Sequence, residues 1–216
     1  MPLTNIFPLS LYNSKIELSE MERNKLVKYI LDCKSSGSHN RYKENTFAWT
    51  GDQEGHGNIH NQEIFQNLFV EVKNKVLDYL DLLFIDHTQF DIYFQRSWAT
   101  ITKDKQKIQF HTHTQSNISF AYYLLKPKNS GGIIFEMNNT PNSICNNIFA
   151  KDKFEKGLMK ESNIYNINQA MFDFKQDSIV IFPSQTRHAT MVNESGQTRI
   201  SLSGDISLML KDSSGF

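Results

Sequence analysis

Several features that would mark particular classes of protein are scarce in this sequence. Its 216 residues include only two cysteines, Cys33 and Cys145, and no CxxC pair, which excludes a disulfide framework and favours a reducing compartment. No apolar run approaches the roughly 18 residues of a membrane span. Lys and Arg number 23, as do Asp and Glu, so the chain lacks the basic surplus with which proteins bind nucleic acid in bulk.

The composition that remains is that of a globular protein. Hydrophobic residues make up 39% of the chain and aromatic residues 12%, which is too rich for a disordered protein. The length suits one domain with a full core, and we find no repeat or linker that would divide residues 1–216. The N-terminus lacks the basic segment and long apolar core of a secretion signal, so we expect a cytoplasmic protein.

Residues 1–85 are expected to form mostly helical support and loop. Ser19 and Glu22 make a capping-box pattern, and the apolar residues after them recur at helical spacing until about Gly37. A broad apolar stripe predicts a second helix from Gln62 to Leu82. The polar stretch 35–61 between them is predicted to be a long surface loop.

From Phe90 onward the apolar period changes to two, which indicates strands. We expect strands at 91–102, 117–125, 132–137, 170–174, 178–182, 188–192 and 198–209. Seven short strands at this spacing favour a barrel or a two-sheet jelly roll over a parallel α/β sheet. The fold class is therefore mainly β with supporting N-terminal helices (α+β), and its β core spans 90–210. Residues 138–168 show no period and are expected to be a functional or mobile loop, such as a substrate lid.

Three histidines in the second half could bind a metal ion. His111 and His113 stand two apart just before a predicted strand, and residues i and i+2 of an extended segment point to the same side. His188 lies at the head of a later strand. A His-x-His pair is also common in strands that bind no metal, so the pair alone is a weak signal.

A potential anion site accompanies the histidines. Arg199 lies in a strand rich in apolar residues, where a charged guanidinium is costly unless an anion pairs with it. One alternative is that Arg199 pairs with an acid of the chain such as Asp177 or Asp205. The other is that its partner is a ligand.

Together, these motifs resemble the iron(II)- and 2-oxoglutarate-dependent oxygenases with a double-stranded β-helix (cupin-like jelly-roll) core. The similar branch is that of bacterial and phage 2OG-Fe(II) oxygenases related to prolyl 4-hydroxylases. The resemblance spans about Trp49 to Leu208. It depends on Trp98, His111-Thr-His113 with Ser116 and Ser119, Ala121-Tyr-Tyr-Leu124, Ser130-Gly-Gly-Ile-Ile-Phe135, Asp177-Ser-Ile-Val-Ile-Phe-Pro183, His188 and Arg199-Ile-Ser-Leu-Ser203.

The resemblance assigns roles to particular residues. It implies that the catalytic metal ligands are His111, His113 and His188. It also implies that the 2-oxoglutarate carboxylate is bound by Arg199, Ser201 and Tyr123, while the neighbouring Tyr122 points to the opposite face. Trp98, Phe110 and Phe135 could line a dry pocket, although ordinary core packing explains each of them equally well.

One departure from the family pattern concerns the third ligand. The usual triad is two histidines and one carboxylate, and His113 stands at the carboxylate position. Either His113 is a ligand, or a carboxylate from elsewhere completes the site, or one of the two paired histidines is not a ligand. Glu136 and Asp173 are the candidates for such a carboxylate.

The function implied is a 2-oxoglutarate-dependent dioxygenase, an oxidoreductase that requires Fe(II), 2-oxoglutarate and O2. A hydroxylase is favoured, with prolyl or peptidyl substrates suggested by the branch. Two alternatives stay open. One is a cupin-like three-histidine metal dioxygenase that does not use 2-oxoglutarate, and the other is a non-catalytic β-sandwich binding module.

The expected partners are a small-molecule or peptide substrate, with no membrane and no bulk nucleic acid. A homodimer is left open. The Asn-, Lys- and Ile-rich usage fits an AT-rich bacterial or phage genome, and for a phage protein the location would be the host cytoplasm.

Overall fold

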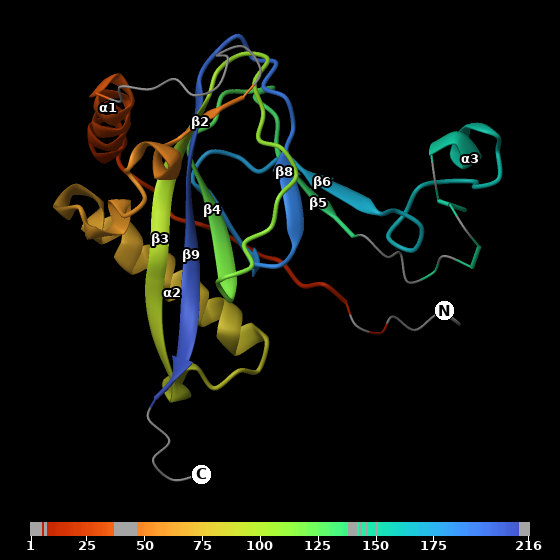
Figure 1. Ribbon diagram of the computed structural model, residues 1–216, viewed down its shortest axis with the longest axis horizontal. Helices are drawn as coiled ribbons and strands as arrows, with labels where there is room; N and C mark the ends of the chain where they lie inside the picture. The colour runs from red at the N-terminus through yellow and green to blue at the C-terminus, as the bar shows by residue number, and fades with distance from the viewer. Residues whose placement is uncertain are drawn as a thin grey trace.

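The computed structural model describes residues 6, 8–36, 47–137, 142, 144–145, 147–149 and 151–211, and they form two β-sheets with a helical layer (Figure 1). The large sheet has the strand order β1-β7-β4-β9-β3-β2, and the small sheet has the order β6-β5-β8. The large sheet consists of β1 (Tyr12–Lys15), β2 (Trp49–Thr50), β3 (Phe90–Thr102), β4 (Ile118–Leu125), β7 (Ser178–Pro183) and β9 (Arg199–Leu210). The small sheet consists of β5 (Ile133–Glu136), β6 (Gln169–Phe172) and β8 (Arg187–Thr190). All these strand pairs are antiparallel, which confirms the predicted jelly roll.

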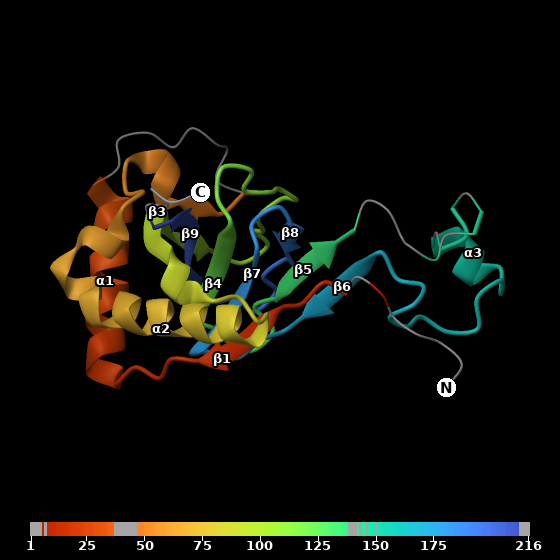
Figure 2. The ribbon, with the colours of Figure 1, turned by 90° about the horizontal axis from the view of Figure 1, so that it is seen from below.

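Two long helices cover one face of the large sheet (Figure 2). They are α1 (Glu20–Ser36) and α2 (Gln66–Leu82). The capping box at the start of α1 forms as predicted, because the Glu22 amide donates to Ser19 Oγ at 3.2 Å and the Ser19 amide donates to the Glu22 carboxylate at 3.1 Å. A short helix, α3 (Lys151–Glu155), projects beyond the ends of β5 and β6, away from α1 and α2 (Figure 2). None of the described helices is long and apolar enough to cross a membrane.

The large sheet is buried on both faces, and the two-residue period of its strands keeps the faces chemically different. On β4, Phe120 and Tyr122 are at most 1% exposed and belong to the apolar core beneath the helices. Their neighbours Ser119 and Tyr123 point to the opposite face, toward the small sheet. The helical side therefore holds the main core, and the other side is free to hold a site.

The seven predicted strands are all present, with ends within two residues of the prediction. Two strands were missed, β1 and β2, because four and two residues are too short to show a period. β1 lies at one edge of the large sheet, where Tyr12 is opposite Ile181 of β7.

The prediction of a surface loop over 35–61 is wrong for its described parts, because residues 35–36 belong to α1 and the segment 47–61 is structured. It contains β2 and the short 3-10 helices η1 (Gly51–Glu54) and η2 (Ile59–Asn61), and Ile59 is only 4% exposed. The helix predicted from Gln62 begins at Gln66, because η3 (Glu63–Phe65) is a 3-10 turn. One more turn, η4 (His87–Gln89), leads into β3.

An ion pair joins α1 to the sheet. Arg23 donates to both carboxylate oxygens of Asp177, at 2.7 and 2.9 Å, and Tyr122 Oη donates to the same carboxylate at 2.9 Å. The Arg23 and Asp177 side chains are only 12% and 17% exposed. A bidentate pair with this burial is more than a surface ion pair.

We expect Arg23→Ala to lower the free energy of unfolding by about 3 kcal/mol, because it leaves the carboxylate of Asp177 shielded from water without its cation. Urea denaturation measures the loss. The control is Lys15→Ala, which removes an ion pair whose side chains are 64% and 79% exposed and should change stability by less than about 0.5 kcal/mol. Equal effects of the two substitutions would contradict the assignment.

Candidate metal and anion site

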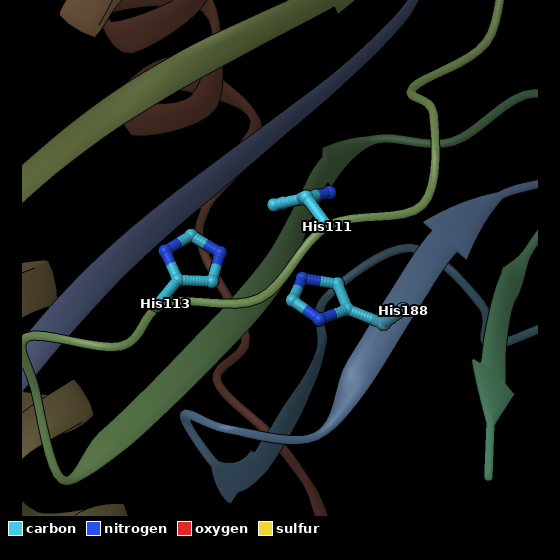
Figure 3. Close-up of side chains that lie close together, drawn as sticks. All are labelled: His111, His113 and His188. Carbon is cyan, nitrogen blue, oxygen red and sulfur yellow. The ribbon is translucent and has the colours of Figure 1, made fainter. Parts of the chain in front are cut away.

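The three predicted histidines come together between the two sheets. Their ligand atoms all lie within 4.8 Å of one another, and the three rings face a common point (Figure 3). An antiparallel bridge sets the spacing, because His111 N–H donates to His188 O at 2.9 Å and His188 N–H donates to His111 O at 3.0 Å. His113 N–H donates to Ser184 O at 2.9 Å. Segments 77 residues apart are thus held by backbone hydrogen bonds.

Hydrogen bonds to main-chain carbonyls orient two of the rings. His111 Nδ1 lies 2.8 Å from Gln109 O, and His188 Nδ1 lies 2.8 Å from Thr186 O. A carbonyl can only accept, so each Nδ1 carries the proton and each Nε2 keeps a free lone pair. This is the tautomer that a metal-binding histidine requires.

His113 is oriented by a carboxylate. Its Nδ1 lies 3.0 Å from the carboxylate of Asp205, whose side chain is 3% exposed. Asp205 also accepts from Arg96 Nε at 2.6 Å and from Ser119 Oγ at 2.8 Å. Burial alone would raise the pKa of Asp205, but the hydrogen bonds from His113, Arg96 and Ser119 lower it below its usual value.

Sequence reasoning missed Asp205 and Arg96 as parts of this site. It considered Asp205 only as a partner for Arg199. A signal was available, because residues 199 and 205 of one strand differ by an even number and so share a face. What it could not show is that the loop carrying His113 passes over that face.

Burial keeps two of the histidines neutral. Desolvation, with a smaller contribution from the neighbouring His111, lowers the pKa of His188 to about 3. The pKa of His111 is also lowered, chiefly by desolvation. Neutral imidazoles are the form that binds metal, so these two residues need no deprotonation at neutral pH.

Arg199 is buried without a carboxylate partner. It is 1% exposed and donates to Ser130 O at 2.6 Å, Gly131 O at 3.1 Å and Thr102 Oγ1 at 3.3 Å. In the part of the chain that the structure describes, no acid forms an ion pair with Arg199. The alternative in which Arg199 pairs with Asp177 or Asp205 is therefore wrong, because Asp177 pairs with Arg23 and Asp205 with Arg96.

A glycine positions the carbonyls that hold Arg199. Gly131 has φ +75°, in the left-handed region, and a Cβ there would lie 2.7 Å from Val192 O. No other residue type fits this turn without strain. The turn points the carbonyls of Ser130 and Gly131 at the Arg199 guanidinium, which also borders the cavity.

Both groups of residues line one cavity of about 430 Å³ between the sheets. Tyr123 and Ser201 also line it and are opposite each other on β4 and β9. Tyr123 is 3% exposed, and its hydroxyl has no hydrogen bond within the described residues. The six residues predicted for the site, which all border this cavity, are His111, His113, His188, Arg199, Ser201 and Tyr123.

The other predicted residues divide between the cavity and its surroundings. Trp98 and Phe110 line the cavity, and Trp98 stacks on His113 with ring centroids 5.6 Å apart. Phe135 does not line it but packs against Phe182 in a small apolar cluster. Tyr122 lies in the main core, as expected.

The two carboxylates considered as substitutes for His113 are engaged elsewhere. Glu136 accepts hydrogen bonds from Arg187 and Gln169, and Asp173 pairs with Lys126 at 2.7 Å. Neither belongs to the group of ligand-type side chains around the histidines.

The loops contribute to the cavity unequally. None of the described histidines outside the cluster lines the cavity. The segment 47–61 contributes five lining residues, which are Phe47, Ala48, Thr50, Asp52 and Gln53. The predicted lid, 138–168, lies partly outside the described residues, and no described residue of it lines the cavity.

The donor set fits a divalent first-row metal ion such as Fe(II). Imidazole is a suitable ligand for iron, and three nitrogens on one side leave positions open for other ligands. The uncompensated guanidinium in the same cavity fits a carboxylate-bearing cosubstrate.

Comparison with known proteins supports the same assignment. A model of the family described as "Putative 2OG-Fe(II) oxygenase" matches residues 96–205. A search of curated proteins finds no match.

Two solved structures share the fold. The non-heme alpha ketoglutarate dependent carbocyclase SnoK from nogalamycin biosynthesis superposes with a TM-score of 0.60 at 9% identity, over 94% of this chain and 82% of that chain. A prolyl-4-hydroxylase from Pseudomonas putida superposes with a TM-score of 0.53 at 12% identity, over 94% of each chain. The match to a 2OG-Fe(II) oxygenase family oxidoreductase from Burkholderia pseudomallei is partial, with 55% of this chain on 46% of that one at 10% identity and a TM-score of 0.40.

The lowered histidine pKa values predict acid sensitivity of the metal-free protein. The unfolded chain takes up a proton at His188 below about pH 6.5, whereas the folded site resists it until about pH 3. Stability should therefore fall as pH drops through this window, with about 1.4 kcal/mol per pH unit from His188. Urea denaturation at pH 6, 5 and 4 measures the slope. His188→Gln should flatten it by that amount, and an unchanged slope would contradict the prediction.

Proposed function

The chain belongs to the 2OG-Fe(II) oxygenase family, and on this premise we propose that it is a hydroxylase whose three clustered histidines hold the Fe(II). It couples conversion of 2-oxoglutarate to oxidation of a C–H bond in a small-molecule or peptide substrate. The observation that carries the proposal is the buried guanidinium of Arg199, which lacks a carboxylate partner in the described protein and borders the same cavity as the histidines.

The metal site is assigned to the Nε2 atoms of His111, His113 and His188. Each ring is held by a hydrogen bond at Nδ1, to Gln109 O, to the Asp205 carboxylate and to Thr186 O respectively. Such bonds fix ring orientation and raise the basicity of the ligating nitrogen. When bound, Fe(II) supplies the activation of O2 that drives decarboxylation of 2-oxoglutarate and oxidation of the substrate.

The 2-oxoglutarate site is assigned to Arg199, Ser201 and Tyr123. The guanidinium is fixed by three acceptors on one side and presents its remaining N–H groups to the cavity. Tyr123 adds a hydroxyl donor from the neighbouring strand. Since Arg199 is buried, its attraction for a carboxylate is weakly screened by water.

Aromatic side chains limit the access of water. Trp98 stacks on His113, and Phe110 also lines the cavity, with the Arg187 guanidinium 5.0 Å from its ring centroid. A dry cavity favours oxidation of the substrate held there over side reactions with solvent.

The proposal includes residues 1–216 as one catalytic domain acting in the cytoplasm, or in the host cytoplasm if the gene is a phage gene. It also includes a homodimer as one form of the enzyme.

We expect His188→Ala to abolish both Co(II) binding and succinate formation, because two imidazoles cannot hold the ion against water. Calorimetric titration with Co(II) and a coupled succinate assay measure the two effects. The control is His87→Ala, which removes a histidine paired with Asp81 outside the cavity and should preserve both. Wild-type affinity in His188→Ala would contradict the metal assignment.

Two neighbouring tyrosines on opposite faces of β4 test the cosubstrate site. Tyr123→Phe should raise KM for 2-oxoglutarate about 10-fold, because a hydrogen bond to a charged group contributes about 1.5 kcal/mol or more. Tyr122→Phe removes a hydroxyl that donates to Ile16 O and Asp177, so it should lower stability and leave this KM unchanged.

Arg199→Lys should raise the same KM about 100-fold, because an ammonium cannot reproduce a bidentate guanidinium. Succinate formation at varied 2-oxoglutarate measures each constant. A wild-type protein that oxidises substrate without consuming 2-oxoglutarate would instead support a cupin-like three-histidine dioxygenase. A protein with neither activity nor metal affinity would support a binding module.

A further inference from the structure

The third metal ligand raises a question of charge. In most of the superfamily a ligand carboxylate offsets part of the charge of Fe(II), whereas His113 is neutral when it binds through Nε2. Three neutral ligands would offset none of the positive charge of the ion. The structure places a buried carboxylate, Asp205, directly behind His113 at 3.0 Å from Nδ1.

The contacts of Asp205 show that it is built into the fold. Ser119 Oγ donates to one of its oxygens at 2.8 Å, and Arg96 Nε donates to the other at 2.6 Å. Ser119 is held in turn by Ser184 Oγ at 2.8 Å, and Ser184 accepts from Ser116 Oγ at 2.8 Å. These partners fix both oxygens of a side chain that is only 3% exposed, so the carboxylate cannot turn away from His113.

We infer that Asp205 is a positioning residue that supplies, through His113, the negative charge that a ligand carboxylate supplies elsewhere in the superfamily. This inference rests on the proposed three-histidine metal site. With the metal on Nε2, the Nδ1 proton of His113 lies between the imidazole and the carboxylate, and a strong acceptor there makes Nε2 a more basic, more negative ligand. A carboxylate can only accept, so Asp205 favours this tautomer over the one in which Nδ1 accepts from Arg96 Nη2, 3.2 Å away.

Arg96 limits how much of this charge reaches His113. Its Nε bonds the same carboxylate, its Nη2 lies 3.2 Å from His113 Nδ1, and its guanidinium lies over Trp98 at 4.8 Å from the ring centroid. A second carboxylate, that of Asp52, lies 3.4 Å from Arg96. Arg96 and His113 thus compete for Asp205, so removing the arginine should act in the opposite direction to removing the carboxylate.

The test is a double-mutant cycle on Co(II) affinity, measured by competition with a chelator. Asp205→Asn keeps the size of the side chain and removes its charge, and should weaken Co(II) binding by about 10- to 100-fold. In a His113→Asp background the same change should have a much smaller effect, because a carboxylate ligand has no Nδ1–H for Asp205 to accept. Only a role exerted through the His113 imidazole predicts this loss of coupling.

Two further variants keep the inference testable if His113→Asp fails to fold. Arg96→Gln should tighten Co(II) binding by a few-fold, and Ser119→Ala, which keeps the charge of Asp205, should change it by less than a few-fold. Thermal denaturation of each metal-free variant establishes folding.

Asp205→Asn that weakens binding equally in both backgrounds, or Arg96→Gln that weakens it too, would show a merely structural residue and overturn the inference. Wild-type affinity in Asp205→Asn would overturn it as well. Failure of the proposed function is distinguishable, because then the wild-type protein itself would not bind Co(II), or His188→Ala would bind it equally well.

Discussion

The structure depends on the alternation of side chains along β9, which lies between β4 and β3 in the large sheet. Ile200, Leu202 and Ile206 face the helical layer, each 1% exposed. The odd-numbered residues 199–205 face the small sheet, and these include Arg199 and Asp205. A shift of one residue in register would exchange the two sets and place a guanidinium and a carboxylate in the apolar core. The hydrogen-bonded pairing of β9 with both β3 and β4 prevents such a shift.

The two faces of the large sheet therefore have different tasks. Under α1 and α2 the buried apolar side chains form the main core, and Gly204 leaves room there for the Phe120 ring, which would lie 2.5 Å from an added Cβ. On the opposite face Arg199 is buried without an acid partner in the described chain, which does not stabilise the fold by itself. The core beneath the helices and the Arg23–Asp177 pair offset that cost. Stability is concentrated on one side, and the chemistry on the other.

The zero net charge of the chain conceals a polarised cavity. Arg199 forms a cationic end suited to a carboxylate, while His111 and His188 stand neutral at the other. Behind His113, Asp205 and Arg96 form an ion pair. A carboxylate therefore lies next to the metal site without being one of the assigned ligands. A cavity with this distribution can hold an anionic cosubstrate and a cation together without a large field at the surface.

Much of the fold followed from local pattern. The period of two in 90–210, the capping box at Ser19 and the apolar stripe of α2 each depend on residues within a few positions of one another. The face on which Tyr123 lies, opposite to Tyr122, followed in the same way. The edge strand β1 was not predicted, because its four residues show no period and it forms only by pairing with β7.

The site was only partly accessible to the same reasoning. The sequence by itself determined which residue types could bind a metal and an anion, because the spacing of His111 and His113 and the apolar strand around Arg199 are local facts. Only the tertiary structure decided that Arg199 has no carboxylate partner among the described residues, that Glu136 and Asp173 are engaged elsewhere, and that Asp205 stands behind His113. Those outcomes depend on contacts between segments as many as 154 residues apart, and the competition among many acids for a few cations is resolved only when the sheets pack together.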